Sequence, residues 1–269
     1  MELLKAIDLS KTYGPERGWF ATNNNKVNAV NNLALSLEQG ENLGLVGESG
    51  CGKSTLARLL MGLEKPSSGK VLYRNMDFTD WSQRRMRMIR SKMQMVFQNS
   101  LSSFNPLFTV EQIIGEPLRN YRAGNAETRR AKVVETLELV GLNGRYLRRY
   151  PHELSGGQQQ RIGIARAVAL RPELIICDEP FSSLDVTLRK QMMDLLRELK
   201  LELGLSYIFI THDLSVVNRF CDSVAVMYQG EIVEKQTGAN IMKQADHPYT
   251  RKLLASVPVQ DPLLRGKRA

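Results

Sequence analysis

Gly47-Glu48-Ser49-Gly50-Cys51-Gly52-Lys53-Ser54 is the stretch of sequence that decides the fold, because it has the spacing G-x-x-x-x-G-K-[ST]. The apolar run Asn42 to Val46 precedes it, and a helical pattern through Leu56 to Met61 follows it. Strand, glycine-rich loop and helix in this order form a phosphate-binding unit. The glycines let successive backbone N–H groups point inward, and the helix start adds a positive potential.

The side chains that end this stretch complete the predicted site. Lys53 should reach the β- and γ-phosphates of a nucleoside triphosphate. Ser54 should place its hydroxyl on Mg²⁺, a hard cation that prefers oxygen ligands, and Thr55 can donate to the α-phosphate. Cys51 has no expected chemical role. The sequence therefore predicts a nucleotide site with Mg²⁺ over Gly47 to Thr55.

Two adjacent carboxylates, Asp178 and Glu179, follow the apolar run Leu174 to Cys177. The carboxyl end of a buried strand is where sheet proteins of this class bind ligands. Neighbouring side chains on a strand point to opposite faces, so Asp178 can hold the Mg²⁺ shell through water while Glu179 orients or deprotonates an attacking water. The alternative is a pair of surface acids in a turn before Pro180.

Between these two sites lies the run Leu154-Ser155-Gly156-Gly157-Gln158. By itself, a run with two glycines is typical of a turn. A helical pattern, Gln158 to Leu170, follows it, and the first N–H groups of a helix bind anions. Together with the phosphate loop and the acidic pair, the run indicates a second contact to the γ-phosphate.

The remaining pattern separates the chain into strand-rich and helix-rich parts. Alternating residues predict strands over Leu3 to Leu9 and Ala29 to Leu37, joined by a polar surface loop, Gly14 to Lys26. Residues 110–149 are largely helical, with Pro117, Gly124, Gly141 and Gly144 as interruptions, and Pro151 ends this part. Thereafter predicted strands at 174–177, 206–210 and 223–228 alternate with helices at 187–203 and 214–220, which indicates a mostly parallel sheet.

Composition excludes several classes of protein. The 269 residues carry a formal charge of +9, and no stretch approaches the length of apolar sequence that a membrane-spanning helix needs. Met1 to Ser10 does not resemble a signal peptide, so we expect a cytoplasmic chain. The three cysteines, Cys51, Cys177 and Cys221, are widely spaced, which argues against disulfides and against a zinc or iron–sulfur site.

The densest basic cluster alternates with methionines and isoleucine and predicts an amphipathic helix that runs into a strand; its charged members are Arg84, Arg85, Arg87, Arg90 and Lys92. Two interpretations stay open: a solvated helix face, or attraction to an anionic membrane surface. Binding of single-stranded nucleic acid is not indicated, because the cluster lacks aromatic residues on which bases stack.

Taken together, the motifs resemble those of the ATP-binding cassette ATPases. The resemblance covers nearly the whole chain and rests on six elements in the expected order: the phosphate loop, Gln98 after a predicted strand at 93–97, Leu154 to Gln158, Asp178-Glu179, Ser182-Ser183-Leu184-Asp185, and His212 in Thr211-His212-Asp213. Tyr13, after Lys11-Thr12, matches the aromatic position on which this family stacks adenine. Without the resemblance, a single tyrosine at a strand end would be interpreted as packing.

The resemblance implies a shared active site. In this family two cassettes close head to tail around two ATP molecules, so Ser155, Gly156, Gly157 and Gln158 would bind the γ-phosphate held by the opposite subunit. Gln98 would contact Mg²⁺ and the attacking water, and His212 would contact the γ-phosphate and support Glu179. Asp185 would belong to the nucleotide-binding set. The implied cofactors are ATP and Mg²⁺.

The same resemblance implies the fold: an α/β P-loop NTPase core with a RecA-like, mostly parallel sheet, an N-terminal antiparallel β subdomain and a helical signalling subdomain. The expected parts are the first section of the ATP-binding core over residues 1–97, the helical subdomain over 98–160, and the rest of the core over 161–269.

Further segments resemble the peptide and nickel importer branch, in particular its second ATPase: residues 95–98, 103–106, 115–118, 215–217, 224–228 and, most specifically, His247-Pro248-Tyr249-Thr250-Arg251. Such chains act at the cytoplasmic face of the cell membrane beneath two permease subunits, usually beside a second, different ATPase, and an extracytoplasmic solute-binding protein delivers the substrate. No nucleic acid is expected. Asn99-Ser100 departs from the usual Asp-Pro and leaves the shape of that loop undetermined.

Two other functions compete with an ATP-driven importer of peptides, nickel or metal chelates. A soluble ATPase of the same fold could act on nucleic acid or serve a cytosolic enzyme assembly, which the basic charge and the lack of membrane spans would suit. A structural partner without hydrolysis is disfavoured by the intact Lys53, Glu179 and His212.

Overall fold

The computed structural model describes residues 1–14, 26–97, 103–182, 184–241 and 244–255. The predicted interval Gly14 to Lys26 therefore falls almost entirely outside the described residues, as does Gln98 with Asn99-Ser100. Among the described residues, none of the helices has the length and apolar character that crossing a membrane requires.

The N-terminal part is a four-stranded antiparallel sheet in the order β2-β1-β4-β5. Its strands are β1 (Glu2–Tyr13), β2 (Val27–Glu38), β4 (Ser68–Tyr73) and β5 (Met76–Asp77). The alternating pattern predicted β1 and β2, and the structure confirms both. Their antiparallel pairing agrees with the antiparallel β subdomain that the resemblance implied. Strands β4 and β5 were not predicted.

The second sheet has six strands in the order β10-β9-β3-β8-β7-β6. They are β3 (Asn42–Val46), β6 (Met93–Val96), β7 (Leu174–Asp178), β8 (Ser206–Thr211), β9 (Ser223–Tyr228) and β10 (Glu231–Thr237). All pairings are parallel except that of β10 with β9. The predicted α/β fold with a mostly parallel sheet is confirmed, and β10 adds an unpredicted polar edge.

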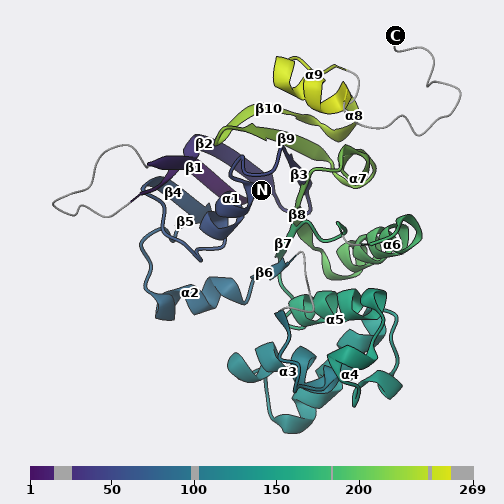
Figure 1. Ribbon diagram of the computed structural model, residues 1–269. Helices are drawn as coiled ribbons and strands as arrows, with labels where there is room; N and C mark the ends of the chain where they lie inside the picture. Colours follow the sequence, from purple (N-terminus) through teal and green to yellow (C-terminus); the bar gives the residue numbers. More distant parts are fainter. Residues whose placement is uncertain (15–25, 98–102, 183, 242–243, 256–269) are drawn as a thin grey trace, which may run out of the picture.

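Helices cover the sheet and extend from one end of it (Figure 1). They are α1 (Lys53–Leu60), α2 (Gln83–Arg90), α3 (Val110–Asn120), α4 (Ala126–Leu139), α5 (Gly156–Val168), α6 (Val186–Leu203), α7 (Leu214–Phe220), α8 (Gly238–Ile241) and α9 (Pro248–Ala255). Two short 3-10 helices, Gly144–Tyr146 and Pro151–Glu153, follow α4. Figure 1 shows α3 and α4 grouped below α5, far from the antiparallel sheet.

Both faces of the parallel sheet are buried, and successive residues along a strand face opposite cores. In β8, Ile208 and Ile210 face the core shared with α1 and the antiparallel sheet, whereas Tyr207 and Phe209 face the core shared with α5, α6 and α7. A strand buried on both faces reads as a continuous apolar run. The sheet thus lies between two layers, and its carboxyl edge is left for ligands.

One prediction about the helical part is wrong. Pro117 does not interrupt the chain's helical structure but lies inside α3. A proline costs a helix one hydrogen bond and crowds the preceding turn. Here only three residues of α3 follow it, and the burial of Ile113, Ile114 and Leu118 holds the helix in place. Gly144 and Pro151 each begin a short 3-10 helix between α4 and α5.

The basic cluster forms α2 as predicted. Met86 and Ile89 are buried, Arg84, Arg85 and Arg87 are exposed, and Arg90 is half-buried; Lys92 follows the helix. Arg85 lies over the Trp81 ring with its guanidinium carbon 3.8 Å from the centroid, and Arg90 donates to the Gly62 carbonyl. Some of the charge is therefore engaged in intramolecular contacts.

Candidate active site

The phosphate loop connects β3 to α1 in a conformation that requires glycine. Gly50 and Gly52 have φ values of 82° and 108°, in the left-handed region that a side chain disfavours. A Cβ atom at Gly52 would lie 2.0 Å from the Ala29 carbonyl oxygen of β2, and one at Gly47 would lie 2.2 Å from the Met227 carbonyl oxygen of β9. The loop is therefore seated closely against both sheets.

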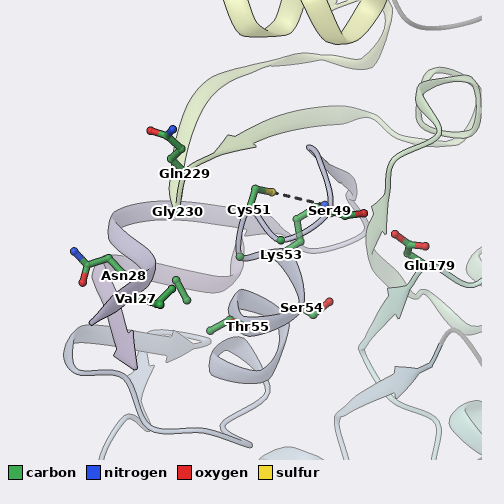
Figure 2. Close-up of a pocket in the computed structure, with 13 residues that line it drawn as sticks. Val27, Asn28, Ser49, Cys51, Lys53, Ser54, Thr55, Glu179, Gln229 and Gly230 are labelled. Atoms are coloured by element: carbon green, nitrogen blue, oxygen red, sulfur yellow. Dashed lines mark hydrogen bonds between the residues drawn. The ribbon is translucent and has the colours of Figure 1, made fainter. Parts of the chain in front are cut away.

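A pocket of about 510 Å³ opens beside this loop (Figure 2). Ser49 to Thr55 line one side, and Glu179 lies across from them. The other lining residues are Val27, Asn28, Ala29, Gln229 and Gly230. Sequence reasoning missed these five residues, because β2 and the β9–β10 turn reach the loop only through the tertiary fold.

Gly230 is the sequence signal for the β9–β10 turn, because glycine adopts positive φ without strain. Gln229 and Gly230 form a two-residue connection with positive φ at both positions, 47° and 87°, which is the geometry of a tight hairpin turn. The turn is fixed to its neighbours by backbone hydrogen bonds: Gly230 N donates to the Cys51 carbonyl at 3.1 Å, and Asn31 N donates to the Gly230 carbonyl at 2.9 Å.

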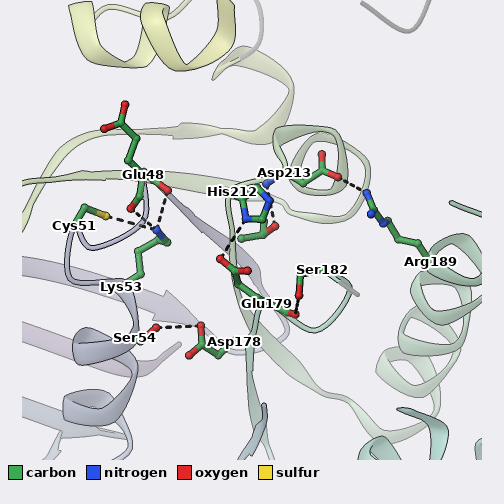
Figure 3. A network of polar contacts seen from close by, with 12 residues as sticks. Glu48, Cys51, Lys53, Ser54, Asp178, Glu179, Ser182, Arg189, His212 and Asp213 are labelled. Atoms are coloured by element: carbon green, nitrogen blue, oxygen red, sulfur yellow. Dashed lines mark hydrogen bonds and ion pairs between the residues drawn. The ribbon is translucent and has the colours of Figure 1, made fainter. Parts of the chain in front are cut away.

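Lys53, the first residue of α1, is buried with only 6% of its surface exposed. Its ammonium Nζ donates to the carbonyl oxygens of Gly47 at 2.8 Å and Glu48 at 2.7 Å, and lies 3.7 Å from the Cys51 Sγ (Figure 3). These acceptors are uncharged. A phosphate would compete for the same N–H donors, because hydrogen bonds between charged partners are stronger.

Ser54 and Asp178 meet at the edge of the sheet, as Figure 3 shows. The Ser54 hydroxyl lies 3.4 Å from Asp178 Oδ1. Burial raises the pKa of the Asp178 carboxyl, and the hydrogen bond from Ser54 opposes that rise. A hydroxyl and a carboxylate side by side are the hard oxygen donors that Mg²⁺ prefers, so these two residues fit the expected metal.

Glu179 and His212 form a second pair beside the first. His212 Nδ1 lies 3.2 Å from Glu179 Oε1, with the imidazole 59% exposed. Parallel pairing of Asp178 with Ile210 brings the two strand ends together, and Glu179 N donates to the Ile210 carbonyl. Glu179 has φ 47°, a conformation rare for a residue with a side chain. The strained backbone directs its carboxylate into the pocket.

The run Leu154 to Gln158 forms the start of α5. Ser155 is the N-cap, and Gln158 closes a capping box with it: Gln158 N donates to Ser155 Oγ, and Ser155 N donates to Gln158 Oε1. Gly157 packs against Leu188 of α6, whereas a Cβ at Gly156 would meet no atom within 4 Å. None of these residues lines the phosphate-loop pocket formed by the described residues.

The last predicted site residues have separate surroundings. Tyr13, at the end of β1, is 39% exposed and donates its hydroxyl to Glu64. Lys11 Nζ lies 5.2 Å from the centroid of its ring. Asp185 is the N-cap of α6: its carboxylate accepts from Leu188 N at 2.8 Å and so stabilises the start of this helix. Gln98 lies outside the described residues.

The sequence is similar to many curated proteins. A probable peptide ABC transporter ATP-binding protein of Sinorhizobium fredii is 48% identical over 97% of the chain and 74% of the relative. The dipeptide transport protein DppF of Escherichia coli is 46% identical, covering 99% of the chain and 79% of the relative. The oligopeptide transport protein OppF of Salmonella typhimurium is 46% identical, covering 99% and 81%.

Solved structures agree with the sequence comparison. The dimeric, post-hydrolysis ATP-binding cassette MJ0796 bound to ADP and Pi superposes with a TM-score of 0.77 at 32% identity, over 87% of this chain and 98% of that one. A second cassette, cbiO1 of Clostridium perfringens, gives 0.78 at 28% identity, over 90% and 91%. The family model described as ABC transporter matches residues 30–182. The chain therefore belongs to the ABC transporter family, as one of its ATP-binding cassettes.

Proposed function

We propose that this chain is the ATP-hydrolysing subunit of a transporter that takes up di- or oligopeptides. The observation that carries the proposal is that Lys53, Ser54 and Glu179 line one pocket. Asp178 is paired with Ser54, and His212 is paired with Glu179. This set of groups can neutralise a triphosphate, hold a divalent cation and accept a proton from water. The peptide transport names of the relatives support the class of substrate over nickel or a metal chelate.

Each residue has a distinct task in this proposal. Lys53 and the loop N–H groups bind the β- and γ-phosphates. Ser54 and Asp178 would hold Mg²⁺, with Gln98 as a further ligand; the ion would neutralise charge on the phosphate oxygens. Glu179 accepts the proton of the attacking water at its carboxylate. His212, hydrogen-bonded to that carboxylate, keeps it oriented.

The proposal needs a second cassette to complete the site. Ser155 to Gln158 begin a helix whose N-terminus is suited to a phosphate, yet they do not line this chain's own pocket. We assign them to the γ-phosphate of a partner cassette, which agrees with the open space at Gly156. On this assignment residues 98–160 are the helical signalling part, and residues 1–97 and 161–269 form the ATP-binding core.

The remaining partners follow from the transporter role. We propose that the chain sits at the cytoplasmic face of the membrane beneath two permease subunits, beside a second and non-identical ATPase, with a solute-binding protein outside. Tyr13 would stack on adenine, and Asp185 would position α6 near the nucleotide. The alternative, a soluble ATPase acting on nucleic acid or in a cytosolic enzyme assembly, is not favoured by the peptide transport names of the relatives.

Affinity isolation from detergent-solubilised membranes tests the transporter role. The tagged chain should bring down two multispanning proteins and a second cassette, and purified complex in liposomes should hydrolyse ATP faster when a peptide-loaded binding protein is added. Recovery of nucleic acid or of a soluble enzyme in place of membrane proteins would refute the proposal. A Lys53→Ala chain is the control, since it should assemble without hydrolysing ATP.

A further inference from the structure

The phosphate loop has a contact from the far end of the chain. Glu48 N, the second backbone amide of the loop, donates to the hydroxyl of Tyr249 at 2.9 Å, across 201 positions of sequence. Tyr249 lies on α9, in the segment His247 to Arg251, and Figure 1 shows α9 beside β10. No catalytic task above uses this residue.

Tyr249 is held in place from two sides. Its ring packs on Tyr228 of β9, with centroids 4.2 Å apart, and its side chain is buried. The start of α9 is tied to β10, because the Glu234 carboxylate accepts from the backbone N–H groups of Asp246 at 2.9 Å and His247 at 3.1 Å. The hydroxyl therefore belongs to a rigid element rather than to a mobile side chain.

The Glu48 amide belongs to the Gly47–Glu48 peptide group, whose Gly47 carbonyl accepts from Lys53 Nζ at 2.8 Å. The Glu48 carbonyl, in the next peptide group, accepts from Lys53 Nζ at 2.7 Å and from Cys51 N at 3.3 Å. Holding the Gly47–Glu48 peptide therefore fixes one carbonyl that positions the lysine ammonium and orients the residue that carries the other. A loop whose N–H groups must converge on a phosphate loses affinity when its backbone must be ordered on binding.

We propose that Tyr249 is a positioning residue for nucleotide binding: its hydroxyl orders the Gly47–Glu48 peptide and thereby preorganises the phosphate loop. The segment after β10 would then set ATP affinity without touching ATP. The inference rests on ATP binding at this pocket. Failure of the wild-type chain to bind ATP would sink the proposed function, whereas equal affinity of wild type and variant would sink only this inference.

Tyr249→Phe tests the proposal, because it removes the hydroxyl and keeps the ring on Tyr228. Losing one neutral hydrogen bond should raise the Kd for ATP about two- to tenfold, with kcat at saturating ATP nearly unchanged. Hydrogen–deuterium exchange at the Glu48 amide should become faster. The matched control is Tyr228→Phe, whose hydroxyl contacts Gln229 and not the loop amide; its Kd should stay at the wild-type value.

Three results would overturn the proposal: an unchanged Kd in Tyr249→Phe, a fall in kcat with no change in Kd, or an equal rise in Kd for Tyr228→Phe. The last result would show that the hydrogen bond to the Glu48 amide is not the cause, because Tyr228→Phe leaves that bond in place. Thermal denaturation of both variants measures whether either has lost stability as a whole. The proposal expects Tyr249→Phe to remain folded like the wild type.

Discussion

Gly156 and Gly157 are neighbours at the start of α5, but a methyl group at each would meet different surroundings. At Gly156 the added Cβ has no atom within 4 Å. At Gly157 it would lie 2.7 Å from Leu188 Cδ1 and 2.9 Å from Cδ2. The two alanine variants therefore separate what this chain needs for its own packing from what it needs for a partner.

The effect on stability can be worked out from these distances. Gly156→Ala should leave the free energy of unfolding unchanged or raise it by about 0.5 kcal/mol, because alanine is the better helix former. Gly157→Ala must displace the end of the Leu188 side chain. Overpacking costs about 1–3 kcal/mol, and since Leu188 ends in rotatable methyl groups, we expect a net loss near the lower limit, about 1 kcal/mol.

Gly156→Ala should lower ATPase activity even though it does not lower stability. If the start of α5 approaches the γ-phosphate of a partner cassette, a methyl group there obstructs the phosphate and weakens a helix N–H contact. Loss of one such preorganised donor lowers turnover about 100-fold or more, so the ATPase rate of the assembled transporter should fall at least tenfold. ATP affinity of the isolated chain should not change, because its pocket does not include Gly156.

Urea denaturation, equilibrium ATP binding and steady-state ATPase assays provide the three measurements. A Gly156→Ala transporter that hydrolyses ATP at the wild-type rate would refute the assignment of this helix start to a partner's phosphate. A Gly156→Ala chain that loses stability would show that the space beside Gly156 is filled in the folded protein, and the structural reasoning would be wrong.

Three further outcomes are expected. Glu179→Gln should lower turnover about 10²–10⁴-fold while retaining ATP, because the amide cannot accept the proton of water; normal hydrolysis would contradict the assigned base. Lys53→Ala should weaken ATP binding more than tenfold, since it leaves phosphate charge unneutralised, and unchanged binding in a direct titration would count against the phosphate-loop assignment. Burial raises the pKa of Glu173, but hydrogen bonds from Tyr73 and Arg74 hold it below its ordinary value of 4.5. The resulting stabilisation is present above the ordinary pKa and is lost as the pH falls through the lowered one. Glu173→Gln should therefore cost about 1 kcal/mol at neutral pH and less near pH 3, and an equal cost at both pH values in urea denaturation would refute this linkage.

The elements that sequence patterns predicted well are those whose local and tertiary demands coincide. The bounds of β3, α7 and β9 agree with the expected runs, since each has an apolar pattern of the right period and a clear stop. Strand β10 carries polar residues on an exposed edge and has no apolar period, so only its pairing with β9 reveals it. Pro117 misled the prediction because burial of its helix outweighs the local cost of a proline.

The sequence by itself predicted the phosphate loop and the acidic pair, because each depends on fixed residue types at a fixed spacing next to a strand, and the family resemblance pointed to His212. Tertiary structure alone decided what surrounds them. Parallel pairing of β7 with β8 places Glu179 beside His212, the β9–β10 turn closes one wall of the pocket, and α9 brings Tyr249 to the loop. These contacts join residues far apart in the chain, and their positions depend on strand order and helix packing, which no local pattern encodes.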